Sequence, residues 1–199
     1  MPRPFVLASR SAIRARLLRE AGVSFETLAA GVDEDAIKAA MAAEAAPPHD
    51  VADTLAEMKA RRGGARRPEA PVLGADQVLA CDGRLFDKPA NLEAAAEQLR
   101  ALRGRRHELL SAAVLVEDGR AVWRHVGRVR LEMRGFSEAF LQAYIEAEGD
   151  ALLDTVGAYR LEGRGAQLFS RIDGDYFSVL GLPLLEVLHV LRGRGVVAE

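Results

Sequence analysis

Cysteine is almost absent from the sequence, which contains one, Cys81, among 199 residues. A single cysteine cannot form an internal disulfide, and a chain without disulfides is typical of a reducing compartment. Aromatic residues are also scarce, at 6%, and acidic residues slightly outnumber basic ones, which gives a net charge of -2. A nucleic-acid-binding module normally presents a basic surface. We therefore expect a cytoplasmic protein with no nucleic-acid partner.

No apolar run is long enough to span a membrane, which takes about 20 consecutive residues. The run near the start, from Phe5 to Ala8, is followed closely by Arg10. This stretch also lacks the charged-then-apolar order of a secretion signal. These features predict a protein with no membrane association.

Three motifs that identify large classes of nucleotide-binding proteins and hydrolases are missing. There is no GxxxxGK[ST] phosphate loop, no GxGxxG after a strand and no GxSxG nucleophile elbow. The four histidines lie far apart and none belongs to an HExxH pair, so neither a zinc site nor a serine–histidine triad is expected. The side chains left for chemistry are carboxylates, lysines, serines and one well-placed arginine.

Apolar residues make up 49% of the chain, and a domain of this length can bury one substantial core. Strand and helix patterns alternate along it, beginning with the strand FVLAS and a helix capped by Ser9 or Ser11. Asp-Gly pairs at Asp82 and Asp118 predict two β-hairpins. Hairpins mixed with crossovers predict an α/β fold with a mixed, twisted sheet flanked by helices. We expect one domain over residues 1–199, with two lobes around a central cleft.

Further elements are predicted from periodicity and from residues that start or stop helices. Strands are expected for VSFETLAAG and for IDGDYFSV. The expected helices span 33–46, begin at Asp50, begin after Asn91, run from Ser137 to Glu148, and begin at Pro183 with Leu184, Leu185, Leu188 and Leu191 on the apolar side.

The segment LASRSAIRARLL is the most informative stretch for function. A helix N-terminus presents free N–H groups and a partial positive charge, which together attract phosphate. Ser9 and Ser11 would add hydroxyl donors there, and the side chain of Arg14, in the first turn, leans back toward the same end. The alternative is that Ser11 only caps the helix and Arg14 is a surface charge.

Four other charged residues stand out. Asp76 follows an apolar, strand-like run, and a carboxylate at a strand end can bind Mg²⁺ or orient water. Lys88 precedes a proline that holds the chain extended. Their simpler interpretations are a turn aspartate and a solvated lysine. Glu34 lies in the acidic stretch GVDED, which is typical of a solvated helix start. The simplest interpretation of Lys59 is a side chain that packs along a helix while its amine reaches solvent.

Seven segments together resemble one known family. They are LASRSAIRARLL, GVDE, LAEMKA, GADQV, DGRLFDKP, GAYRLEGRGA and IDGDYFSVLGLPL, in this order, between Leu7 and Leu191. Their order is similar to that of the Maf family of nucleotide pyrophosphatases. The resemblance implies an α/β fold of the inosine-triphosphatase type. It also implies hydrolysis of a nucleoside triphosphate to the monophosphate and pyrophosphate.

The resemblance further implies roles for individual side chains. Glu34 and Asp76 would form the acidic pair that binds the metal and handles the attacking water, with Asp76 as proton acceptor. Phosphate binding would fall to Ser9, Ser11, Arg14, Lys59 and Lys88. Asp154, in DTVGAY, matches a recurrent acidic position whose role stays open.

The resemblance also implies three positions that determine base specificity in the family. In this sequence they are occupied by Ile13, Gln77 and Glu162. Members similar to the thymidine and uridine triphosphate enzymes have arginine, threonine and glutamine there. Members similar to the 7-methyl-GTP enzymes have tryptophan, glutamine and glutamate, so Gln77 and Glu162 match this subgroup and Ile13 matches neither. Glutamate can accept hydrogen bonds from the N1–H and 2-amino groups of guanine, so a purine, including a modified one, is the expected base. Ile13 alternatively belongs to the apolar side of its helix.

The implied cofactor is a divalent metal, with Mg²⁺ expected and Mn²⁺ and Co²⁺ left as alternatives. The implied partner is the nucleoside triphosphate. The resemblance also implies a possible homodimer, the form that is common in the family. Two other functions stay open at this point. One is a house-cleaning triphosphatase that accepts several non-standard nucleotides, and the other is a non-catalytic regulator of cell division.

Overall fold

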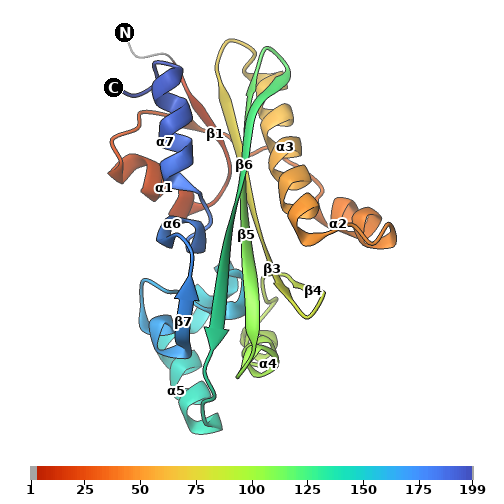
Figure 1. Cartoon of the computed structure of the whole chain (residues 1–199), viewed down its shortest axis with the longest axis vertical. Helices are drawn as coiled ribbons and strands as arrows, with labels where there is room; N and C mark the ends of the chain where they lie inside the picture. The colour runs from red at the N-terminus through yellow and green to blue at the C-terminus, as the bar shows by residue number, and fades with distance from the viewer. Residues whose placement is uncertain (1–3, 199) are drawn as a thin grey trace. The chain divides into compact units, whose positions relative to one another are not determined.

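A computed structural model describes residues 4–198 of the chain (Figure 1). Residues 1–3 and 199, which belong to the domain expected from the sequence, lie outside the described residues. The described chain forms a seven-stranded sheet in the order β2-β1-β3-β5-β6-β7, with β4 paired to β3. β1 runs parallel to β2 and β3, whereas β4 is antiparallel to β3 and β7 to β6. The sheet is therefore mixed, which confirms the predicted α/β class.

Strands and helices follow one another along the chain as follows. The strands are β1 (Val6–Ala8), β2 (Glu26–Thr27), β3 (Val72–Cys81), β4 (Arg84–Phe86), β5 (Arg106–Glu117), β6 (Arg120–Met133) and β7 (Phe169–Asp173). The helices are α1 (Ala12–Glu20), α2 (Glu34–Ala43), α3 (Pro48–Arg66), α4 (Leu92–Leu102), α5 (Glu138–Glu148), α6 (Tyr176–Val179) and α7 (Leu184–Gly193). Three short 3-10 helices separate α5 from β7: η1 (Gly149–Asp154), η2 (Val156–Ala158) and η3 (Arg164–Leu168). No helix within residues 4–198 combines the length and apolar character needed to cross a membrane.

The chain divides into two compact units, and each is built from separated stretches. The first unit comprises the residues up to Gln77, Leu110–Gly127, and the residues from Asp175 onward. The second comprises Val78–Leu109 and Arg128–Gly174. The boundaries fall inside β3, β5 and β6, so these strands contribute residues to both units.

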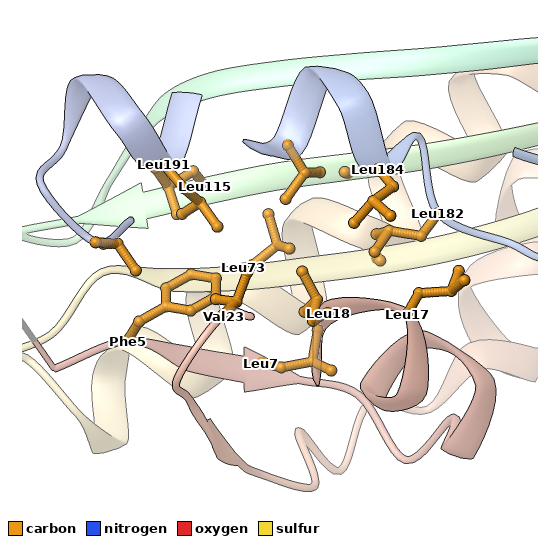
Figure 2. Close-up of a cluster of buried hydrophobic side chains, with 14 of the residues drawn as sticks. Phe5, Leu7, Leu17, Leu18, Val23, Leu73, Leu115, Leu182, Leu184 and Leu191 are labelled. Carbon is orange, nitrogen blue, oxygen red and sulfur yellow. The ribbon is translucent and has the colours of Figure 1, made fainter. Parts of the chain in front are cut away.

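The core of the first unit lies between one face of its strands and the helices α1 and α7 (Figure 2). Alternate side chains of β1, β3 and β5 point into this cluster, as strand geometry requires. They are joined there by apolar residues of the two helices. The cluster includes Phe5, Leu7, Leu17, Leu18, Leu73, Ala75, Ala113, Leu115, Leu184, Val187 and Leu191.

The opposite face of these strands is covered closely by α3. A Cβ atom on Gly74 would lie 2.1 Å from the backbone oxygen of Ala56 and 2.4 Å from the nitrogen of Ala60. A Cβ on Gly63 would lie 2.7 Å from the Val72 side chain. Glycine at both positions therefore lets the backbone of α3 approach β3 directly. Side chains of α3 and β3 near this contact can then reach one another.

Several features of the fold differ from the sequence-based predictions. α3 begins at Pro48 rather than Asp50. Proline suits the first turn of a helix, because N–H groups there have no acceptor within the helix and the missing N–H of proline costs no hydrogen bond. The strand predicted for VSFETLAAG pairs only at Glu26 and Thr27, since its neighbour β1 is itself three residues long. Leu185, predicted on the apolar side of α7, is 57% exposed.

The segment IDGDYFSV is not a single strand. β7 ends at Asp173, Gly174 takes a φ of 141°, and α6 follows. The carboxylate of Asp175 accepts hydrogen bonds from the backbone N–H groups of Phe177 and Ser178, at 3.2 and 2.6 Å. This aspartate caps α6, and a capped helix cannot continue the strand.

The second unit contains a buried aromatic cluster. His107 Nε2 lies 3.0 Å from the hydroxyl oxygen of Tyr159, and the rings of Tyr159 and Phe169 meet edge to face at 4.8 Å. Burial lowers the pKa of His107 to about 4. The imidazole is therefore neutral near pH 7 and packs as part of the core of this unit.

Candidate active site

The loop between β1 and α1 carries two serines that face the start of the helix. The hydroxyl of Ser11 accepts a hydrogen bond from the backbone N–H of Arg14 at 3.3 Å, so the predicted cap is confirmed. Ser9 is buried, and its hydroxyl accepts from the backbone N–H of Ser11 at 3.2 Å and from the Arg14 guanidinium at 3.4 Å. Each hydroxyl still carries a hydrogen that it can donate. Together with the first N–H groups of α1, they can bind an anion.

Arg14 is buried, with 9% of the residue exposed, so the interpretation of it as a surface charge is wrong. Its Nε donates to the carbonyl of Gly181 at 2.7 Å and its Nη1 to the carbonyl of Ala75 at 3.0 Å. Burial lowers the pKa of Arg14, and the negative charges of Asp76 and Glu34 oppose this shift. The guanidinium therefore ties the segment after α6 to β3 in the neighbourhood of two carboxylates.

Asp76 lies within β3, not at the strand end that the sequence suggested, because β3 continues to Cys81. In the parallel pair of β1 and β3, Ala8 is opposite Gly74, so Ser9 and Asp76 both lie just beyond this level. Side chains alternate along a strand, and Asp76 therefore points to the face that α3 covers. There the Asp76 carboxylate is buried and accepts a hydrogen bond from Nζ of Lys59 at 2.5 Å.

Lys59 is buried within the first unit, and the prediction that its amine reaches solvent is wrong. Its Nζ also lies 2.9 Å from Oε1 of Glu34, so one ammonium bridges carboxylates from α2 and β3. Burial acts to raise the pKa of Glu34, but the hydrogen bond and charge of Lys59, together with the charges of Lys38 and Arg14, lower it overall. Glu34 is therefore ionised at neutral pH.

Gln77 points to the face of β3 opposite Asp76. Its Nε2 lies 2.9 Å from the hydroxyl of Ser111, 2.9 Å from the carbonyl of Ser178 and 3.1 Å from that of Val179. The Ser111 hydroxyl donates to the same Ser178 carbonyl at 2.6 Å. Ser111 and Ser178 are both buried, and neither was among the site residues predicted from the sequence. The available signal was a single hydroxyl in the apolar strand LLSAAVLV.

Residues 4–194 of the chain match the model of the family described as Maf-like protein. The chain belongs to the Maf family. Among similar proteins is the nucleoside triphosphate pyrophosphatase of Roseobacter denitrificans, which is 56% identical with 98% of both chains covered. The nucleoside triphosphate pyrophosphatases of Ruegeria pomeroyi and Caulobacter vibrioides are 54% and 51% identical, over 98% and 96% of both chains.

A solved structure with some similarity is the nucleoside-triphosphatase, or dITP/XTP pyrophosphatase, of Mycobacterium abscessus. It is 17% identical, with a TM-score of 0.44, over 97% of this chain and 95% of that chain.

Most of the residues matched to Maf motifs lie in the first unit. Contacts and electrostatic interactions there connect Ser9, Ser11, Arg14, Glu34, Lys59 and Asp76. Ile13 packs partly against the buried cluster beneath α1, in agreement with its core interpretation. The bridge through Lys59 was not predicted, because it joins residues from three separate elements.

The other matched residues of the Maf motifs lie in the second unit. Lys88 is exposed in the loop between β4 and α4, and Asp154 is exposed at the end of η1. Glu162 is largely buried, with Oε1 3.6 Å from Nε of Arg160, and Nη1 of the same arginine lies 3.5 Å from Oε2 of Glu148. The functional roles of Lys88, Asp154 and Glu162 stay predictions.

Proposed function

We propose that this Maf-family chain is a hydrolase that cleaves a nucleoside triphosphate between its α and β phosphates, releasing the monophosphate and pyrophosphate. Relatives with more than half of their residues identical are named nucleoside triphosphate pyrophosphatases. The observation on this chain that best supports the proposal is the convergence of Glu34 and Asp76 on Nζ of Lys59, at 2.9 and 2.5 Å. Two carboxylates that meet at one cation suit metal-assisted attack of water on phosphorus.

The acidic pair also suits the divalent metal that the family implies. Glu34 and Asp76 offer oxygen donors, and a cation, the ammonium of Lys59, already lies between them. Residues 4–198 contain no larger cluster of His, Cys, Asp or Glu side chains arranged for a metal. Mg²⁺ commonly binds one or two carboxylates and fills its remaining positions with water and substrate phosphate oxygens. We therefore assign Mg²⁺ to this pair, with Mn²⁺ or Co²⁺ as substitutes; bound there, the metal would polarise phosphate oxygens and acidify water.

The surrounding side chains can position the phosphates and move the proton. Phosphoryl transfer depends mainly on positioning and charge neutralisation. Asp76, fixed within β3, would accept the proton of the attacking water. Ser9 and Ser11 would donate hydrogen bonds to phosphate oxygens at the positive end of α1, and Arg14 would add a buried positive charge beside them. On the family resemblance we assign Lys88 a further phosphate contact.

The proposed substrate is a purine nucleotide with a guanine-type base, 7-methyl-GTP included. The Nε2 atom of Gln77 is already shared among three acceptors, which leaves its Oε1 as the atom available to a base. Ile13 is aliphatic and packs partly against the core, so it offers no aromatic surface to a cationic base. Base preference should therefore depend mainly on Glu162, whose carboxylate can accept two hydrogen bonds from guanine.

A panel of triphosphates tests the reaction and the base together. GTP, 7-methyl-GTP, ITP, ATP, dTTP and UTP would be incubated with Mg²⁺ or with EDTA, and the products separated. We expect monophosphate and pyrophosphate in equal amounts, only with metal, and fastest from the guanine nucleotides. Release of diphosphate and orthophosphate would refute the site of cleavage. Equal rates with all bases would instead identify a broad house-cleaning enzyme.

A conservative variant tests the base assignment separately. Glu162→Gln keeps the size of the side chain but removes the acceptor pair, so the ratio of kcat/KM for GTP to that for UTP should fall about tenfold or more. Glu148→Gln changes the other acid near Arg160 and is the matched control, with an unchanged ratio expected. An unchanged ratio in Glu162→Gln would show that the base is recognised elsewhere.

A further inference from the structure

Lys59 lies at the position between Glu34 and Asp76 where the proposed metal would be held. Its Nζ is 2.9 Å from Oε1 of Glu34 and 2.5 Å from Oδ1 of Asp76. The exposed fractions of the side chains are 11% for Lys59, 33% for Glu34 and 8% for Asp76. The ammonium therefore already pairs with both carboxylates, of which Asp76 is buried and Glu34 is partly exposed.

The negative charges of the two acids are compensated without a metal, and Lys38 adds a further positive charge near Glu34. The carboxylates of Glu34 and Asp76 are offset by the ammonium of Lys59 and the guanidinium of Arg14, which interacts with both acids. A free divalent cation would leave an excess of positive charge in partly buried surroundings, which is unfavourable. A complex of the metal with a triphosphate is net negative, so it brings the charge that compensates the added cation.

Two features allow the lysine bridge to open. Lysine carries its ammonium on a flexible four-carbon stem, so Lys59 can turn toward a phosphate without displacement of α3. Glu34 is the first residue of α2, a helix with no buried residue, which lies beside the N-terminal end of α3 in Figure 1. The bridge to Lys59 thus joins this end of α2 to α3. Asp76, by contrast, is held within the sheet.

We propose that Lys59 is the resident counter-cation of the acid pair and keeps free divalent metal out, so that metal enters with the nucleotide rather than before it. The inference rests on the proposed metal-dependent function. On binding of the nucleotide, the ammonium of Lys59 would move from the carboxylates to phosphate oxygens. Glu34 and Asp76 would then be free to hold the metal.

Binding of Mn²⁺ to the protein without nucleotide tests this order. The signal of free Mn²⁺ in electron paramagnetic resonance would give the affinity of the folded wild type and of variants. We expect Lys59→Met to bind Mn²⁺ at least tenfold more tightly than the wild type, because two carboxylates lose their internal cation. Lys59→Gln, which can still donate a hydrogen bond to one acid, should also bind more tightly and serves if the methionine variant does not fold.

Lys38→Met is the matched control, because Lys38 also acts electrostatically on Glu34. We expect its affinity for Mn²⁺ to rise much less than that of Lys59→Met. Equal affinity of the wild type and a folded Lys59 variant would overturn the inference, as would an equally large gain in Lys38→Met. If no variant bound Mn²⁺, the inference would also be overturned, because the acid pair would then not be a metal site. The nucleotide panel with and without EDTA decides independently whether the proposed reaction needs metal.

Thermal unfolding gives a second readout that does not involve turnover. Removal of Lys59 leaves the buried carboxylate of Asp76 and the partly buried carboxylate of Glu34 without their bridging ammonium, which should lower the melting temperature. Mn²⁺ should then raise the melting temperature of Lys59→Met more than that of the wild type, because it binds the folded variant more tightly. The same increase in both proteins would contradict the proposed exclusion.

Discussion

Asp76 and Gln77 are consecutive residues of β3 whose side chains serve opposite faces of the strand. Asp76 accepts a hydrogen bond from Lys59 of α3 at 2.5 Å, whereas Gln77 donates to the carbonyl of Val179 in α6 at 3.1 Å. The alternation of side chains along a strand explains the division. It assigns the aspartate to the charged cluster and the glutamine to the attachment of α6.

Replacement of Asp76 by asparagine should lower kcat for pyrophosphate release by at least about 100-fold, the low end for loss of a general base. Asparagine keeps the shape and a hydrogen bond to Lys59 but cannot accept the proton of water. Asp35→Asn, at an exposed position in the first turn of α2, is the control and should retain the wild-type rate. A fully active Asp76→Asn enzyme would place the proton acceptor elsewhere.

Replacement of Gln77 by leucine should destabilise the fold by about 1–3 kcal/mol, with or without nucleotide, because the carbonyl of Val179 loses its amide donor. Urea unfolding followed by circular dichroism measures the change. Gln142→Leu, on the exposed side of α5, should change the free energy of unfolding by less than about 0.5 kcal/mol. Unchanged stability of Gln77→Leu together with altered base preference would mean that the amide serves the substrate instead.

Replacement of Gly74 by alanine should destabilise the first unit by about 3 kcal/mol or more, since the new methyl group would collide with the backbone of α3. Displacement of α3 would also move Lys59 away from Asp76, so activity should fall as well. In Gly193→Ala, a Cβ would meet no atom within 4 Å, and stability should stay the same or rise by up to about 1 kcal/mol. Equal melting temperatures for these two variants would contradict the close approach of α3 to β3.

His107 should make stability depend on pH between about 6.5 and 4. Its pKa is lowered to about 4 in the folded protein from an ordinary value of 6.5, so in this range the unfolded chain binds the proton more strongly. Stability therefore falls as pH falls, by about 2 kcal/mol between pH 7 and pH 5 from this group. The loss should be smaller in His107→Gln and unchanged in His189→Gln, an exposed control on α7. Chemical unfolding at both pH values measures it, and the same loss in His107→Gln would refute the assignment.

Features set by a few neighbouring residues were predictable from the sequence. The cap at Ser11 and the cap at Asn91 follow from side chains that reach a backbone N–H three residues away, and both are confirmed. The turns at Asp82 and Asp118 are confirmed too, with positive φ at each aspartate and at the glycine after it. Such local interactions need no knowledge of distant parts of the chain.

The arrangement of the charged site was harder to predict, because it depends on packing between distant segments. Lys59 and Asp76 were expected to face the same substrate, but their direct bond depends on the approach of α3 allowed by Gly63 and Gly74. The position of Asp76 inside a strand was missed, since a strand covered on both faces shows no apolar–polar alternation around its charged residue. Burial of Arg14 was also missed, because its carbonyl partner at Gly181 lies far along the chain.

The course of β3, β5 and β6 through both units has a consequence for engineering. Transplanting the second unit from a relative, to exchange base preference as a cassette, would require four junctions, three of them inside hydrogen-bonded strands. A chimera of this kind would break the strand that carries Asp76 directly after Gln77. Selectivity in this scaffold is therefore better altered by point substitutions than by modular recombination.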